Sequence, residues 1–137
     1  MINRGVLMKK LIRLLPTPFE NDQNEIRLRF GEDTGLVVDV LCADKINNID
    51  FGVVFAFRVF DEGLLQEFSE YSDEEIKQLK ATGCLSGIYQ VEDGNYIREI
   101  DSISRGILNN YSPKQYIIIS SNYVIEIVSF APCITVN

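Results

Sequence analysis

The stretch Gln115–Phe130, QYIIISSNYVIEIVSF, constrains the fold of this 137-residue chain more than any other part of the sequence. It contains two β-rich runs, Tyr116–Ile119 and Tyr123–Phe130, separated by Ser-Ser-Asn, a spacing typical of a hairpin. The first run is apolar at every position, which indicates a strand covered on both faces. In the second run one face is apolar and the other, which holds Glu126, is mixed. We expect this hairpin at the centre of a sheet.

The first half of the chain predicts a second hairpin and another apolar strand. Glu25–Phe30 alternates apolar and charged residues, as in a half-buried strand, and a GEDTG turn leads into a strand over Leu36–Cys42. Ala43–Asp50 is polar, and we expect a loop there. The strongly apolar run Phe51–Phe60 predicts one strand. Residues 6–15 fit either a strand or a short helix.

The second half of the chain mixes helical spacing with strand patterns. Asp61–Tyr71 places apolar residues at helical spacing, and a capping box then predicts a helix over Asp73–Lys80. Cys84–Val91 predicts another strand. The apolar stripe of Tyr96–Leu108 predicts a second amphipathic helix.

These segments predict one α+β domain that spans residues 1–137. Its sheet would be mostly antiparallel, with about six or seven strands, and two or three short helices would lie on one face or edge. In the helix predicted over Tyr96–Leu108, Asp101 and Arg105 have the spacing of an ion pair one turn apart.

The chain contains no histidine, which removes the commonest general base and metal ligand. Ser–His and Cys–His nucleophile systems are therefore excluded within this sequence. The three cysteines, Cys42, Cys84 and Cys133, lack the spacing of a zinc site, and we expect reduced, buried thiols in the cytoplasm. We expect no metal and no cofactor and assign no catalytic residue, so the sequence favours a protein that is not an enzyme.

The net charge of −7 is unevenly spread. Residues 1–15 carry four basic and no acidic side chains, whereas the rest of the chain carries nine basic and twenty acidic ones. The basic residues interrupt the apolar ones at this end, so we expect no signal peptide. No apolar run of the sequence approaches the roughly 18 residues needed to span a bilayer. A basic amphipathic segment that touches lipid is the alternative interpretation of this end. An acidic surface repels nucleic acid and suits a basic protein partner.

Seven acidic residues and no Lys or Arg fall within Asp61–Glu75. Such a run is a solvated helical face, a docking surface for a cationic partner, or part of a metal or acid–base site. In the docking interpretation, Tyr71 is an aromatic anchor. The candidate partner-binding residues are Asp61, Glu62, Glu67, Glu70, Tyr71, Asp73, Glu74 and Glu75.

Arg58 and Tyr96 are candidate ligand-binding residues, because inward polar groups of this kind suit a pocket between a sheet and its helices. Arg58 lies within an apolar strand, either at a rim with its stem along the core or in contact with a buried anion. Glu126 either faces outward or is buried with a functional role. Both residues lie on predicted strands, so Arg58 and Glu126 can pair across the sheet.

Two blocks, Val53–Phe68 (VVFAFRVFDEGLLQEF) and Gln115–Pro132 (QYIIISSNYVIEIVSFAP), resemble small bacterial immunity-type proteins of polymorphic and contact-dependent toxin systems. The likeness consists of a strand that ends in Asp-Glu-Gly before a short helix, followed much later by a closing hairpin with Glu-Ile-Val. It implies a cytosolic, non-enzymatic inhibitor that binds a toxin tightly. It assigns no site residue.

Three functions are compatible with the sequence. The first is a protein-binding, immunity-like inhibitor, monomeric or homodimeric, whose acidic surface occludes a basic toxin or effector. The second is a small-molecule binding module with an apolar pocket. The third is a carboxylate- or metal-dependent enzyme, which requires several acidic side chains to converge.

Overall fold

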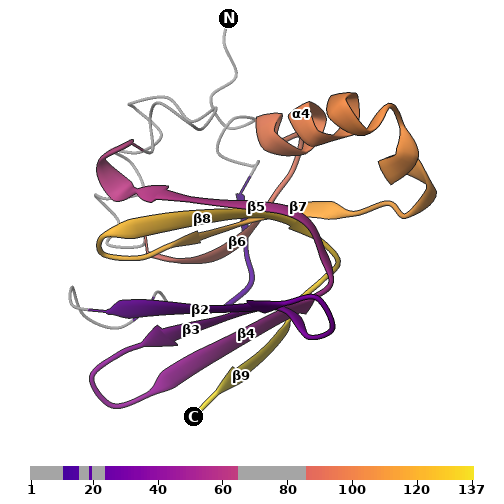
Figure 1. Cartoon of the computed structure of the whole chain (residues 1–137). Coiled ribbons are helices and arrows are strands. Elements are labelled where there is room, and N and C mark those ends of the chain that lie inside the picture. The colour runs from indigo at the N-terminus through magenta and orange to yellow at the C-terminus, as the bar shows by residue number, and fades with distance from the viewer. Residues whose placement is uncertain (1–10, 16–18, 20–23, 65–85) are drawn as a thin grey trace, which may run out of the picture.

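Two antiparallel sheets stack face to face in the computed structural model (Figure 1), which describes residues 11–15, 19, 24–64 and 86–137. The five-stranded sheet has the order β1 (Leu11–Arg13), β6 (Gly87–Val91), β7 (Lys114–Ile119), β8 (Tyr123–Ser129), β5 (Val54–Asp61). The four-stranded sheet has the order β2 (Glu25–Gly31), β3 (Gly35–Leu41), β4 (Ile46–Gly52), β9 (Cys133–Val136). The described residues also form the helix α4 (Asn95–Ser104) and two 3-10 turns, η1 (Glu62–Leu64) and η2 (Ile107–Asn110).

The predicted central hairpin is confirmed. β7 and β8 pair with Ile118 opposite Ile125, and they lie between β6 and β5 in the larger sheet. Apart from the first residue of each strand, both are buried on both faces. The predicted hairpin of β2 and β3 is also confirmed, with Glu25 opposite Leu41.

The main core lies between the two sheets. The four-stranded sheet contributes Leu36, Val38, Val40, Ile49 and Phe51, and the five-stranded sheet contributes Ile88, Tyr116, Ile118, Ile125 and Ile127. Burial of each such side chain stabilises the fold by about 1.5–3 kcal/mol. Because side chains alternate along a strand, Glu126 faces away from this core, toward the outer side where α4 lies.

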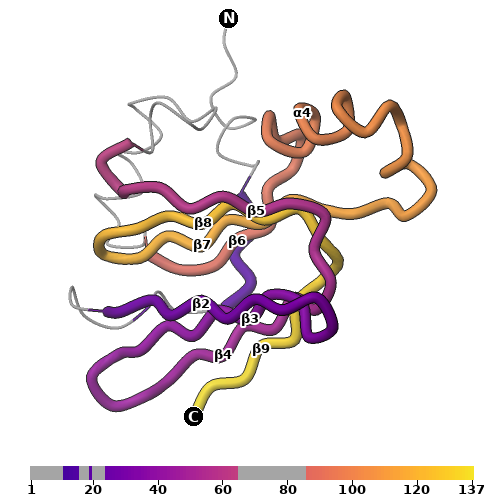
Figure 2. The backbone as a smooth tube through the Cα atoms, viewed as in Figure 1, coloured from indigo at the N-terminus to yellow at the C-terminus, as the bar shows by residue number. Residues whose placement is uncertain are grey.

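Two chain segments cross between the sheets at one end of the molecule: β4 continues into β5, and β8 continues into β9 (Figure 2). Glycine permits the first crossing, because a Cβ on Gly35 would lie 1.8 Å from the carbonyl oxygen of Gly52. Gly52 itself has a φ of 64°. Ser129 Oγ donates a hydrogen bond to the carbonyl oxygen of Val53 over 2.8 Å and joins the two crossings.

The predicted α+β class is wrong. The described residues form two antiparallel sheets with one α-helix and two isolated 3-10 turns, not one sheet with two or three helices. The run Phe51–Phe60, predicted as one strand, passes from one sheet to the other, since β4 ends at Gly52 and β5 begins at Val54. A continuous apolar run does not show where the chain passes from one sheet to the other.

Two further strands were not predicted. β4 includes most of the predicted loop Ala43–Asp50, and its polar residues fit a strand because they bond within the sheet. Asn48 Nδ2, for example, donates to Asp39 Oδ1 over 2.7 Å. β9 is short and pairs with β4. Cys133, on β9, is an exposed free thiol, which corrects the prediction that it is buried, and Cys42 is half-buried.

α4 is shorter than the helix predicted over Tyr96–Leu108, because the chain turns sharply at its C-terminal end. Arg105 has a φ of 57° and Gly106 a φ of 84°. The backbone N–H of Gly106 bonds to the carbonyl oxygen of Asp101 over 3.4 Å, which closes the helix after Ser104. Arg105 therefore does not continue the helix, and the predicted ion pair one turn apart does not form.

The remaining helix predictions fall at the edge of the described residues or beyond it. The described part of Asp61–Tyr71 contains only the 3-10 turn η1, and the helix predicted over Asp73–Lys80 lies outside the described residues. Near the N-terminus, Leu11–Arg13 is a strand. In the described ranges, no helix has both the length and the apolar content needed to cross a membrane.

Candidate functional site

An ion pair between Arg58 and Glu126 lies on the outer face of the five-stranded sheet. The two residues are direct partners in the register of β5 and β8. Arg58 Nε donates to Glu126 Oε1 over 2.7 Å, and Arg58 Nη2 lies 2.6 Å from the same oxygen. The Glu126 side chain is fully buried, and that of Arg58 is 27% exposed. The predicted pairing across the sheet is confirmed, and Glu126 is buried rather than facing outward into solvent.

Gln115 connects this ion pair to the start of α4. Its Nε2 donates a hydrogen bond to Glu126 Oε2 over 3.3 Å, and its Oε1 accepts one from the backbone N–H of Ile97 over 3.0 Å. Gly94, at the N-cap, has no side chain to cap the helix. The buried amide of Gln115 therefore supplies the acceptor that a capping side chain otherwise provides.

Tyr96, on α4, packs over the guanidinium group of Arg58, whose Cζ lies 4.2 Å from the ring centroid. Burial raises the pKa of Tyr96 above its ordinary value, and the positive charge of Arg58 offsets part of that rise. The folded state thus favours the neutral phenol. This contribution to stability is complete below the pKa of an unfolded tyrosine and is lost as the pH rises through the folded pKa.

The two predicted ligand-binding residues, Arg58 and Tyr96, are therefore brought together in one network. The charge of Arg58 is matched by buried Glu126 and by exposed Glu99 on α4, whose Oε2 lies 3.7 Å from Arg58 Nη1. Between α4 and the sheet, Tyr96, Leu108 and Val128 form a buried apolar cluster. The arrangement orders α4 on the sheet, and ligand binding at Arg58 and Tyr96 stays a prediction.

The structure describes two of the eight predicted docking residues. Asp61, exposed, ends β5 opposite Tyr123, and its Oδ1 accepts a hydrogen bond from the backbone N–H of Gly63 over 2.7 Å. Glu62 begins η1, and its backbone N–H bonds to the carbonyl oxygen of Asn122 over 2.8 Å. The other six, Glu67, Glu70, Tyr71, Asp73, Glu74 and Glu75, lie outside the described residues. Docking at this acidic run stays a prediction.

A cavity of about 250 Å³ lies between α4 and the segment that follows it. Its lining includes apolar Ile97, Leu108 and Pro113 and polar Asp101, Asn109 and Ser112. Asp101 Oδ1 is buried and has no hydrogen-bond partner within the described part of the chain. Arg98 also lines the cavity, but its guanidinium donates to the carbonyl oxygen of Asp93 over 2.6 Å and to Asn95 Oδ1, near the start of α4.

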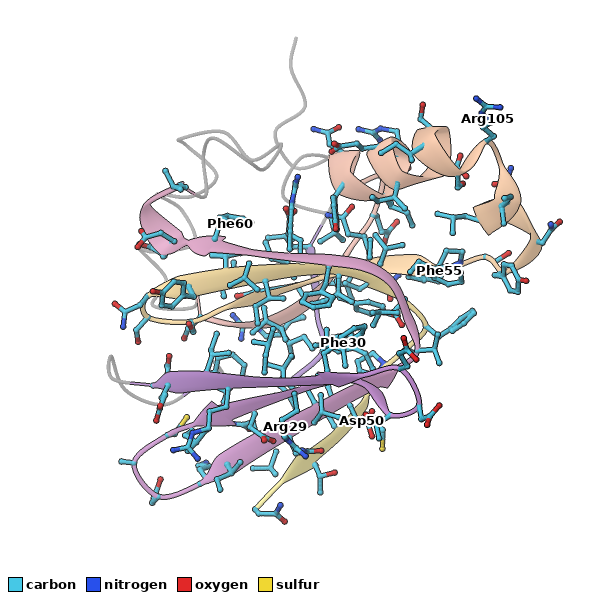
Figure 3. The ribbon with its side chains drawn as sticks, viewed as in Figure 1. Arg29, Phe30, Asp50, Phe55, Phe60 and Arg105 are labelled. Atoms are coloured by element: carbon cyan, nitrogen blue, oxygen red, sulfur yellow. The ribbon has the colours of Figure 1, made fainter. Side chains whose placement is uncertain are left out.

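Three aromatic side chains meet at this end of the molecule. The ring centroid of Phe55 lies 5.5 Å from that of Tyr111 and 5.6 Å from that of Phe130. Tyr111 is 55% exposed and Phe130 is 44% exposed. The register of β5 shifts between Val54 and Ala56, and a bulge of this kind changes the direction of the Phe55 side chain. Figure 3 shows Phe55 below the end of α4, at the opposite end of β5 from Phe60.

The cavity and the aromatic contacts share one chain segment, because Tyr111 lies between cavity residues Asn109 and Ser112. Two further apolar side chains, Ile103 of α4 and Ile107 of η2, are also exposed here. We call this surface the α4–η2 end; it consists of Phe55, Ile103, Ile107, Tyr111, Phe130 and the cavity. Within the described residues no group of three or more Cys, Asp or Glu side chains could hold a metal ion.

Sequence reasoning missed Gln115, Asp101 and the aromatic contacts. Gln115 had a visible signal, since it is a polar residue directly before an apolar strand that is covered on both faces. Asp101 was paired with Arg105 in the predicted helix, and only the turn at Arg105 separates them. The contacts of Phe55 depend on a bulge, for which the apolar run gives no local signal.

No family model matches the chain, and neither a curated protein nor a solved structure matches it. The resemblance of Val53–Phe68 and Gln115–Pro132 to immunity-type proteins stays a prediction. Function is therefore inferred from the geometry and chemistry of the described residues.

Proposed function

We propose that this chain is a cytosolic, non-enzymatic protein-binding module, an immunity-type inhibitor that occludes a basic partner protein. The observation that carries the proposal is the contact of half-buried Phe55 with two exposed rings, Tyr111 and Phe130. Contiguous apolar side chains on a surface are typical of interaction sites, and aromatic residues dominate the binding energy of many interfaces. The α4–η2 end therefore supports protein binding better than catalysis.

The net charge of −7 indicates the sign of the partner's charge. Long-range attraction increases the rate at which a basic protein meets an acidic one, whereas nucleic acid is repelled. Inhibition then follows from covering the partner's active site, which requires no chemistry from this chain. The lack of histidine is compatible with that mechanism.

Two surfaces at opposite ends of β5 are candidates for docking. The acidic run begins at Asp61, where β5 ends beside Tyr123. The α4–η2 end lies near Phe55, where β5 begins. We favour the α4–η2 end because it combines exposed aromatic side chains with a cavity.

Two matched tyrosine variants separate these surfaces. Tyr111→Ala removes a ring that is 55% exposed at the α4–η2 end, and Tyr123→Ala removes one that is 51% exposed beside the acidic run. Isothermal titration calorimetry measures the affinity of each variant for the protein encoded by the neighbouring gene. We expect Tyr111→Ala to weaken binding about 30-fold, as for a hot-spot residue worth about 2 kcal/mol, and Tyr123→Ala to change it by less than about twofold.

Results that differ from these expectations bear either on the docking site or on the function itself. Weaker binding by Tyr123→Ala alone would assign docking to the acidic run and keep the protein-binding function. No binding by the wild-type chain, or turnover of a substrate by the purified chain, would contradict the function itself. Circular dichroism of both variants checks that the fold is retained, which we expect because both rings are exposed.

A further inference from the structure

The cavity at the α4–η2 end is built from three successive parts of the chain. Asp101 belongs to α4, Leu108 and Asn109 belong to η2, and Pro113 lies just before β7. Its volume of about 250 Å³ is below the range of about 300–1,000 Å³ that is usual for pockets that enclose a small-molecule ligand. A volume of this size suits a single inserted side chain.

Asp101 carries its negative charge where the helix disfavours it. The C-terminal end of a helix has a partial negative charge, and the last turn of α4 contains no basic residue. Asp101 Oδ1 is also sheltered from solvent without a donor among the described residues. Both features lower stability, and a bound cationic donor would offset both.

The two neighbouring arginines are directed elsewhere. Arg98 donates to the carbonyl oxygen of Asp93 and to Asn95, at the opposite end of α4. Arg105 follows the last residue of α4 with a φ of 57° and projects outward from the helix end, away from the sheet (Figure 3). Within the described ranges, neither neighbouring arginine therefore supplies a donor to Asp101 Oδ1.

We propose that this cavity receives an arginine side chain of the basic partner, whose guanidinium group donates hydrogen bonds to Asp101 Oδ1. The inference rests on the proposed function, because it assigns one contact within the partner interface. Ile97, Leu108 and Pro113 would contact the aliphatic stem, as apolar walls commonly do. Arginine suits this site better than lysine, because its planar fork carries five donors, and the cavity lining offers side-chain oxygens of Asp101, Asn109 and Ser112.

The first test uses N-acetyl-arginine amide, whose blocked ends resemble a residue within a chain. Titration into the full chain, followed by NMR of the backbone amides, should shift the signals of Asp101, Leu108 and Asn109. Asp101→Asn keeps the shape of the side chain and removes its charge, so we expect about tenfold weaker binding. Asp93→Asn is the matched control: Asp93 is exposed beside the start of α4, and asparagine tolerates its φ of 53°. We expect it to leave the affinity unchanged.

Two outcomes of this titration would overturn the inference. Equal affinity of the wild-type chain and Asp101→Asn for the probe would show that the carboxylate does not bind it. Tighter binding of free L-arginine than of the blocked probe would indicate a site for a free amino acid instead of a partner side chain. Weaker binding of N-acetyl-lysine amide, by contrast, is the result expected for a guanidinium site.

Binding measurements with the partner protein distinguish a failure of this inference from a failure of the proposed function. We expect Asp101→Asn to weaken binding to the neighbouring gene product about tenfold and Asp93→Asn to leave it unchanged. If Tyr111→Ala weakens that binding and Asp101→Asn does not, the function stands and the arginine contact is wrong. If the blocked arginine binds through Asp101 but the chain binds no partner, the proposed function fails, and the assignment of the cavity to a partner fails with it.

Discussion

Glu126 and Asp101 are carboxylates near the two ends of α4, and their surroundings are opposite. Glu126 is fully buried, and its two oxygens accept hydrogen bonds from Arg58 and Gln115. Asp101 is half-buried, and in the described part of the chain its Oδ1 has no donor. Burial alone therefore does not identify a functional group. A buried charge with its partners in place holds the fold, whereas a charge that lacks one can accept a ligand.

Glu126→Leu tests this comparison with the largest expected effect on the free energy of unfolding. Leucine has a similar size, so the main result is an Arg58 charge and a Gln115 amide that have lost a partner. We expect the free energy of unfolding in urea to fall by about 3 kcal/mol, the lower end for breaking a buried ion pair, because Arg58 keeps Glu99. Adding Arg58→Met should restore part of this loss, since the uncompensated charge is then absent.

Glu25→Leu is the matched control for that variant. Glu25 and Arg27 form a pair 3.6 Å apart whose side chains are 65% and 63% exposed. Exposed pairs of this kind contribute about 0–1 kcal/mol, so we expect little change in the free energy of unfolding. If Glu126→Leu destabilises the chain no more than Glu25→Leu does, Glu126 does not hold the fold, and the contrast with Asp101 is wrong.

Gln115→Leu tests whether the buried network orders the start of α4. The variant removes the acceptor for the Ile97 N–H and a donor to Glu126. We expect a loss of about 2 kcal/mol in the free energy of unfolding and faster hydrogen exchange at the Ile97 amide. Gln90→Leu, on neighbouring β6, controls for the same replacement in the sheet. Unchanged exchange at Ile97 would show that Gln115 does not cap the helix.

The strands were predictable where one local pattern decides the structure. Alternation in Glu25–Phe30 and the GEDTG turn indicated the β2–β3 hairpin, and the apolar run of β7 indicated a strand covered on both sides. The two-layer arrangement was not predictable, because it depends on a crossing at Gly52–Val53 inside one apolar run. The polar strand β4 was missed for a related reason: Asn48 bonds to Asp39, which lies on a different strand.

The candidate site was predictable only where it follows from strand pairing. Arg58 and Glu126 each lie on a predicted strand, so their pairing needed only the correct register. The α4–η2 end instead depends on backbone geometry that the sequence does not specify, namely the left-handed turn at Arg105 and the bulge at Phe55. A helix continued to Leu108 would have paired Asp101 with Arg105, whereas in the described part of the chain Asp101 Oδ1 has no donor.

Asp101→Asn has the smallest expected effect on the free energy of unfolding. The direction of that change is the informative result. Most substitutions destabilise a protein, yet here we expect the free energy of unfolding in urea to rise by about 0.3–1 kcal/mol, because a negative charge leaves the negative end of α4. Added salt should reduce the gain, since it screens interactions of this kind. A loss of stability would show that Asp101 is paired in solution, with Arg98, which lines the same cavity, as a candidate, and the contrast with Glu126 would disappear. A gain in stability combined with weaker binding of the blocked arginine would show that the chain keeps this carboxylate for binding and is less stable because of it.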